Sequence, residues 1–126
     1  MAIVYTTAVK NARLDAVTAQ IDAGSGAGVL QIGTTGMGTI LAEITLNDPS
    51  AASAASGVLT FSGFPKSDTS ANNTGTAAEA RIRDSNGTNI ITGLTVGTTA
   101  SDINLDSVSI TSGQTVTITS ATITHA

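Results

Sequence analysis

The residue best suited to acid–base chemistry in this chain is its single histidine, His125, which is the penultimate residue. A Ser-His-Asp triad requires an imidazole that a third group holds in a fixed orientation. Chain ends are usually the least ordered parts of a domain, so we expect His125 to be a surface residue. The chain has no cysteine, which excludes disulfides, thiolate zinc sites and thiol catalysis. We therefore predict that the protein is not an enzyme.

The glycines at positions 24, 26 and 28 invite comparison with a dinucleotide-binding loop. The third glycine of a G-x-G-x-x-G motif would fall at position 29, which is Val29. The glycines also follow an expected helix and precede an expected strand, which is the reverse of the order that the motif needs. We interpret them as a helix exit followed by a flexible turn, and we expect no cofactor.

The segment from Asp102 to Asp106 matches the opening D-x-N-x-D of a calcium loop. The match then fails, because the sixth position is Ser107 rather than glycine and the twelfth is Gly113 rather than glutamate. Alternate polar residues are also typical of the outer face of a strand. We favour the strand face over an adventitious calcium site and predict no metal centre.

Two of the five basic residues, Arg81 and Arg83, share one face of an expected strand with Glu79. One interpretation is a solvated strand face with ion pairs worth about 0–1 kcal/mol each. The alternative is a contact with an acidic patch on a partner. Alternation alone produces the first arrangement, which we favour, but the second stays open.

The composition limits the possible partners. The chain has 126 residues and a net charge of -4, with 11% charged and 40% hydrophobic residues. The acidic balance argues against nucleic acid, whose non-specific binding depends on clustered Lys and Arg. No run approaches the roughly 18 apolar residues of a membrane helix, so we expect no membrane partner. The length suits a single domain, residues 1–126.

An N-terminal arm and helix are expected over residues 1–23. Residues 7–22 contain no glycine or proline, and Thr6 or Thr7 can cap the first turn. Leu14, Val17 and Ile21 recur at helical spacing and form a narrow apolar stripe. Gly24 is the expected stop, because glycine adopts the left-handed conformation at low cost. So short a helix must dock on the rest of the domain.

A β-rich body is expected over residues 28–126. Apolar runs and period-2 alternation predict strands near residues 29–32, 40–46, 58–62, 78–83, 108–110 and 116–123, with a bulge near Ser120. A return strand is expected to begin at residues 90–91. Asn86-Gly87 predicts a hairpin with a type I′ turn, whereas residues 50–57 and 66–76 are expected to be loops. Short strands with frequent turn signals favour a mainly β fold: an antiparallel β-sandwich or barrel-like domain with one short N-terminal α-helix.

The expected core is poor in aromatic side chains. The only aromatic residues are Tyr5, Phe61 and Phe64, although each buried aromatic contributes roughly 150–250 Å² of buried surface. Self-association would supply the missing burial without lengthening the chain. We therefore expect a homo-oligomer, with the apolar Ile3, Val4 and Tyr5 as candidate contact residues.

Several segments resemble small virion proteins of tailed bacteriophages, namely the head decoration, or cement, proteins. The motifs are IDAGSGAGVLQI at residues 21–32, ILAEITLNDP at 40–49, TGTAA at 74–78, RIRDSNGT at 81–88 and ITSGQTVTIT at 110–119. The family's glycine turn matches Gly24, Gly26 and Gly28, and its hairpin turn matches Asn86 and Gly87. These motifs are turns and strand faces rather than a catalytic signature.

The resemblance implies a β-rich, often trimeric protein that binds the outer surface of the capsid and holds neighbouring major capsid protein subunits together. It implies a virion location after assembly in the cytoplasm of the bacterial host. A fibre, tail or receptor-binding module of adhesin type is the alternative. No motif identifies the contact residues, and our candidates for the capsid or subunit interface are Ile3, Val4, Tyr5, Leu14, Val17, Arg81 and Arg83.

Overall fold

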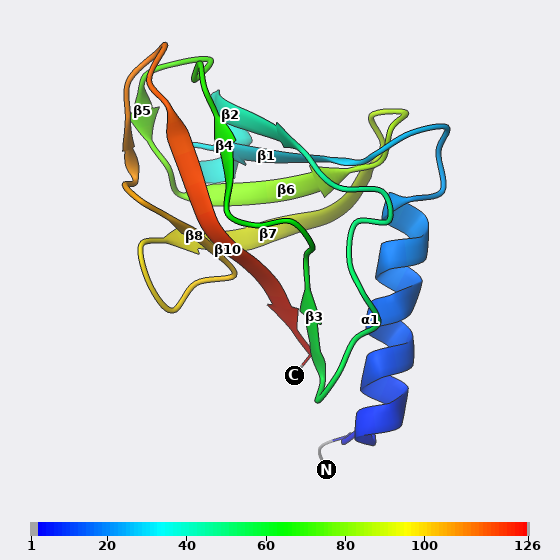
Figure 1. Ribbon diagram of the computed structural model, residues 1–126. Coiled ribbons are helices and arrows are strands. Elements are labelled where there is room, and N and C mark those ends of the chain that lie inside the picture. Colours follow the sequence, from blue (N-terminus) through cyan, green and yellow to red (C-terminus); the bar gives the residue numbers. More distant parts are fainter. Residues whose placement is uncertain (1–2, 126) are drawn as a thin grey trace.

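The computed structural model describes residues 3–125, in which one helix precedes a series of short strands (Figure 1). Helix α1 spans Thr7–Ile21, and a single 3-10 turn, η1, spans Thr35–Met37. The strands are β1 (Val29–Gly33), β2 (Ile40–Thr45), β3 (Val58–Thr60), β4 (Lys66–Asp68), β5 (Gly75–Thr76), β6 (Glu79–Arg83), β7 (Asn89–Gly97), β8 (Ile103–Leu105), β9 (Ser109–Ile110) and β10 (Val116–Thr124).

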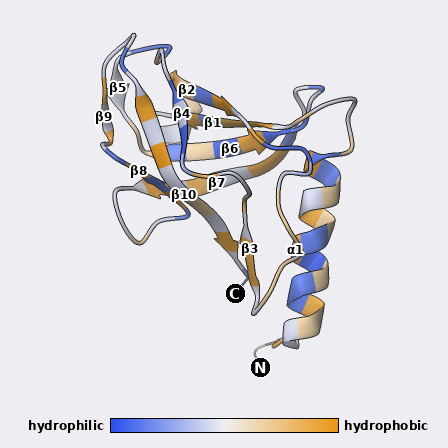
Figure 2. Cartoon of the chain, in the orientation of Figure 1, coloured by the Kyte–Doolittle hydropathy of each residue, from blue (hydrophilic) through white to orange (hydrophobic). Residues whose placement is uncertain are grey.

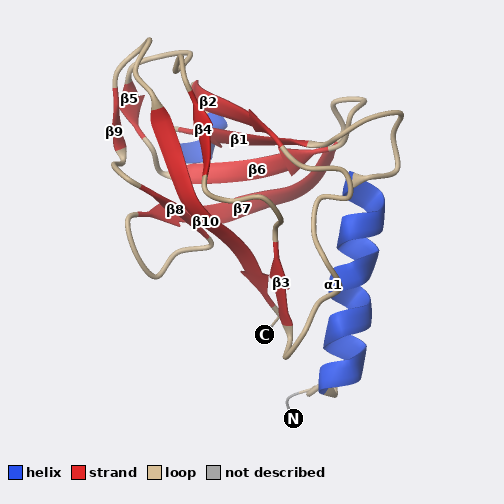
Figure 3. Ribbon diagram, viewed as in Figure 1, coloured by secondary structure: helices blue, strands red, loops and turns tan. Residues whose placement is uncertain are grey.

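Most of the strands form one sheet that curls into a half-barrel (Figure 3). The strand order is β2-β1-β6-β7-β8-β10-β3, and β4 also pairs with β10. The expected mainly β, barrel-like domain with one N-terminal helix is confirmed. The expectation of a wholly antiparallel sheet is wrong in one place, because β7 and β8 pair in parallel through Val96 and Ile103.

The pleat of the strands separates a core face from an outer face, as the hydropathy colours of Figure 2 indicate. Leu30 and Ile32 of β1 face the same way as their cross-strand neighbours Ile82 and Ala80 of β6, and all four side chains are buried. Leu14 and Ile21 of α1 belong to the same hydrophobic cluster. The helix and the sheet therefore share one core.

A second, two-stranded sheet of β5 and β9 covers one part of β2. Alternation predicts Leu41 on the outer face, but its side chain is fully buried. A Cβ atom placed on Gly75 would lie 3.1 Å from Leu41 Cδ2, so the backbone of β5 packs directly on this leucine.

The expectation that residues 66–76 form a loop is wrong, because that segment contains the strands β4 and β5.

Helix α1 forms where its cap and apolar stripe predict it. The Thr6 side chain accepts a hydrogen bond from Val9 N at 3.3 Å. Leu14 and Ile21 are buried, and Val17 packs against the core beside them. The expected stop at Gly24 is wrong, because the helix ends at Ile21 with Asp22 as its right-handed C-cap. Gly24 instead lies against Ser85 Oγ, where a side chain would clash.

The loop over residues 50–57 is more firmly held than its run of small residues predicts. Ser50 and Ala51 are buried, and Ala51 forms an isolated bridge with Phe61. Ala55 and Val58 form a second bridge. This segment therefore continues the sheet toward α1 instead of forming a loose connection.

The hairpin between β6 and β7 is confirmed, although its turn differs from the type I′ turn expected. Asp84 N donates to Thr88 O, and among the residues of this turn only Gly87 has a positive φ, at 84°. The turn is therefore a three-residue loop with glycine in the left-handed position. The bulge expected near Ser120 is confirmed by a register shift between Ile118 and Ser120.

Candidate interaction surfaces

The N-terminal arm, residues 3–6, carries the most exposed large apolar side chains among residues 3–125. Ile3 is 79% exposed, Val4 82% and Tyr5 39%, and Val9 at the start of α1 is 42% exposed. The structure thus places three of the predicted interface residues together at one end of the molecule, beside the start of the helix (Figure 1). An exposed apolar group of this kind is typical of a protein contact.

Tyr5 anchors the arm to the body of the protein. The Arg13 guanidinium lies 4.6 Å from the centre of the Tyr5 ring. The ring of His125 meets the Tyr5 ring edge-on, with 5.8 Å between their centres. The backbone N–H of His125 also donates to Gly57 O at 2.9 Å. His125 is therefore half-buried and held in place, rather than the loose surface residue that its position predicts.

Two predicted interface residues on the helix have another role. Leu14 is only 3% exposed, and Val17 packs against the same core. Both lie on the helix face that docks on the sheet, because the apolar stripe supplies the burial that the helix needs within its own chain. Leu14 is thus wrong as an interface residue, and Val17 contributes mainly to the core.

Arg81 belongs to a hydrogen-bonded row on the outer face of the sheet, which we call the polar ladder: Asn72, Glu43, Gln31 and Arg81. Arg81 Nε donates to Gln31 Oε1 at 2.7 Å, and Gln31 Nε2 donates to Glu43 Oε2 at 2.8 Å. Asn72 Nδ2 donates to the other oxygen of Glu43 at 3.0 Å. Gln31 is only 7% exposed, so the ladder holds these outer side chains in fixed positions.

The ion pairs expected around Glu79 do not form among residues 3–125. Arg83 Nε donates to Asn89 Oδ1, and Arg81 donates to Gln31, so both guanidinium groups have amide partners. Glu79 Oε1 accepts from Gly36 N at 2.9 Å instead. Both arginines keep partial exposure, which leaves their charge available to an acidic partner.

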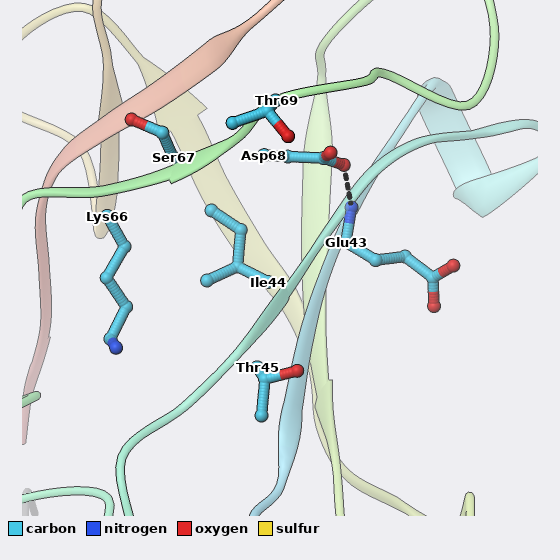
Figure 4. Close-up of a pocket in the computed structure, with 7 residues that line it drawn as sticks. All are labelled: Glu43, Ile44, Thr45, Lys66, Ser67, Asp68 and Thr69. Atoms are coloured by element: carbon cyan, nitrogen blue, oxygen red, sulfur yellow. Dashed lines mark hydrogen bonds between the residues drawn. The ribbon is translucent and has the colours of Figure 1, made fainter.

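A cleft of about 390 Å³ lies between β2 and β4 (Figure 4). Its walls are residues 43–45 of β2 and residues 66–69, which include β4. Asp68 Oδ2 accepts a hydrogen bond from Glu43 N at 3.0 Å where the two segments approach. Lys66 Nζ donates to Asn47 Oδ1 at 2.7 Å, just beyond the end of β2. Sequence alternation did not identify this cleft, because the two strands are not paired.

The segment that resembles a calcium loop is part of the β8 strand region. Asp102 Oδ2 accepts from Thr95 N, Asn104 Oδ1 from Ser101 N and Asp106 Oδ1 from Thr117 N. The three side chains are thus directed to three different backbone amides. These contacts agree with the strand-face interpretation.

The sequence pattern did not reveal the structural role of two residues at these surfaces. Gln31 and Glu43 were not identified, although each stands at an outer position in the alternation of its strand. The pairing of Gln31 with both Glu43 and Arg81 follows from strand register. Register depends on the turns and on which strands become neighbours, and the local pattern did not specify these.

No helix within residues 3–125 combines the length and apolar character needed to cross a membrane. Comparison of the chain with protein-family models, with curated proteins and with solved structures found no match. A functional assignment must therefore be argued from the motifs of the sequence and from the surfaces described above.

Proposed function

We propose that this chain is a structural protein of a bacteriophage virion, a head decoration protein that binds the outer surface of the capsid and stabilises contacts between major capsid protein subunits. The support from sequence is the resemblance of five segments to small virion proteins of tailed phages. One of them, residues 81–88, forms the β6–β7 hairpin, and another, residues 21–32, joins the end of α1 to β1.

The observation that carries the proposal is the distribution of exposed apolar side chains. Ile3, Val4, Tyr5 and Val9 are the exposed large hydrophobic residues of the described chain, and they gather at one end. Most of the other large apolar side chains are buried in the common core or packed against it. A firm β body with one apolar, projecting end suits a structural protein that assembles with other protein chains, sister copies included.

A decoration protein acts through buried area and needs no reactive group. A stable contact buries more than about 1,000 Å² in total, or about 500 Å² from each partner. That contribution is under a tenth of the 6211 Å² surface of this chain. Copies on a lattice also bind with a raised effective concentration. Once one edge of the protein is bound to the capsid, its other edges are held close to their own binding sites.

The outer sheet face supplies a second candidate contact. The polar ladder fixes Arg81, and Asn89 positions Arg83. Two positioned guanidinium groups on one strand suit carboxylates of a capsid subunit, because guanidinium and carboxylate groups form geometrically specific hydrogen bonds. In this proposal the arm and the sheet face bind separate partners, namely a copy of this chain and the major capsid protein, and the assembly is a homotrimer.

The proposal is tested with particles from the bacterium that carries the gene. Particles with and without this chain are heated, and release of their DNA is followed with a dye. We expect particles without the chain to release DNA at a lower temperature, and purified chain added back to restore the original temperature. Adding back an Arg81→Glu, Arg83→Glu variant should restore less stability.

Equal release temperatures for the two kinds of particle would contradict the proposal. A deletion that leaves heat stability unchanged but abolishes attachment to cells would favour a receptor-binding or fibre module instead. Binding of purified chain to tails but not to tail-free heads would favour the same alternative.

A further inference from the structure

Strand β2 has one open edge. It is the terminal strand of the main sheet and pairs only with β1 on its other side. Leu46 N donates to Gly28 O, so the even-numbered residues of β2 bond to β1 and the odd-numbered residues direct their backbone groups outward. Glu43 N is capped by Asp68, but within residues 3–125 the backbone N–H and C=O of Thr45 have no partner.

These backbone groups open into the β2–β4 cleft. Figure 4 shows Asp68 directed at the Glu43 N–H at the narrow end, while Thr45 and Lys66 lie on diverging segments. The buried Ile44 also lines the cleft. The volume of about 390 Å³ falls within the roughly 300–1,000 Å³ of ordinary binding sites. The cleft therefore offers an open sheet edge beside an apolar side chain.

The same chain contains a segment with complementary properties. Residues 3–5 belong to no helix or strand, and their backbone makes no hydrogen bond within residues 3–125. Ile3 and Val4 are β-branched, which favours an extended strand, and each is more than three-quarters exposed. The arm lies near the end of β10, at the opposite end of the molecule from the cleft (Figure 1). It therefore does not reach the cleft of its own chain.

We propose that the N-terminal arm of one copy adds as a strand to the open edge of β2 in a second copy. Its backbone pairs with the N–H and C=O of Thr45, and its side chains enter the cleft that Ile44 helps to line. Strand addition of this kind draws affinity from the backbone and specificity from alternate side chains. The contact joins two different surfaces, so its repetition gives a ring of copies if the rotation between neighbours closes and an open filament if it does not. It concerns the isolated chain and holds whether or not the protein binds a capsid.

Engineered cysteines test the exchange directly, because the chain has no cysteine of its own. Purified Val4→Cys and Thr45→Cys proteins are mixed under mild oxidation, and the products are separated on a non-reducing gel. We expect a disulfide-linked dimer that contains one copy of each variant, identified by mass. The control mixture replaces Thr45→Cys with Asn86→Cys, in the exposed hairpin loop, and should give at least about tenfold less of the mixed dimer.

Failure of Val4→Cys to link with Thr45→Cys, or equal linking in the control mixture, would overturn the proposal. A second pair of variants tests the backbone contact. Thr45→Pro removes the outward N–H without touching the bonds to β1, whereas Thr45→Val keeps it. We expect Thr45→Pro to weaken self-association at least about tenfold by light scattering, and Thr45→Val to leave it close to the original. Unchanged association of a folded Thr45→Pro protein would contradict strand addition.

Discussion

At the scale of single residues, the glycines after the helix act by permitting close approach. Gly28 is buried between the end of α1 and the end of β6. A Cβ atom at this position would lie 2.6 Å from Ile21 Cγ2 and 2.8 Å from Arg83 O. Gly26, two residues earlier, has nothing closer than Ser85 Cβ at 4.0 Å. Substitutions at these two glycines can therefore be compared to separate the effect of crowding from the effect of chain flexibility.

Gly28→Ala should lower the free energy of unfolding by about 1–3 kcal/mol, because the added methyl group displaces the helix end or the β6 backbone. Gly26→Ala should change it by less than about 1 kcal/mol, since the site is open and neither glycine has a positive φ. Urea denaturation of both variants provides the measurement. Similar losses for the two variants would show that the crowding at Gly28 is not real.

Residue patterns predicted the apolar stripe of Leu14, Val17 and Ile21 that packs on the core, because helical periodicity is a local property. They did not predict the polar ladder. Gln31 is almost fully buried on the outer face only because Glu43 and Arg81 flank it on adjacent strands. That environment requires the register of three strands, which the local alternation does not contain.

At the scale of elements, the polar face of α1 explains why residues 50–57 are ordered. Asn11 Oδ1 accepts from Gly57 N at 2.9 Å, and Asp15 Oδ1 accepts from Ala54 N at 2.7 Å. Asp22, after the last turn, accepts from Ser50 N. The spacing of four and seven residues places these side chains on one side of the helix. The helix thus binds the sheet through Leu14 and the loop through its acidic and amide side chains.

Asp15→Ala should increase the hydrogen-exchange rate of the Ala54 amide and lower the free energy of unfolding by about 0.5–1.5 kcal/mol, because that amide loses its acceptor. Gln20→Ala, at an exposed position of the same helix, should change neither quantity measurably. Exchange measured by NMR separates the local effect from the global one. An unchanged Ala54 amide would mean that Asp15 does not hold the loop.

Elements with strong local signals were predicted well. The β6–β7 hairpin has a glycine turn between apolar runs, and α1 has a cap and a periodic stripe. Strand β4 is Lys66–Asp68, three polar residues that become a strand only by pairing with β10. The parallel contact of β7 and β8 follows a short loop over residues 98–102, where turn signals favour antiparallel strands.

At the scale of the whole molecule, the features of interest are on its surface. The arm is apolar and projects from one end. The polar ladder fixes the charged side chains of Glu43 and Arg81 on the outer sheet face, and the edge of β2 that faces the β2–β4 cleft is unpaired. Sequence composition favoured self-association through the arm, but the cleft depends on the curl of the sheet and was not predicted. We propose that the three surfaces divide the contacts with sister copies and with capsid subunits.

The most direct test of this account is a cryo-electron microscopy map of purified particles from the bacterium that carries the gene. We predict density for this chain on the outside of the head, at junctions between capsid subunits, with one trimer at each equivalent junction. The sheet face that carries Arg81 and Arg83 should point toward the shell. Density confined to the tail or a fibre, with a copy number set by tail symmetry, would contradict the account.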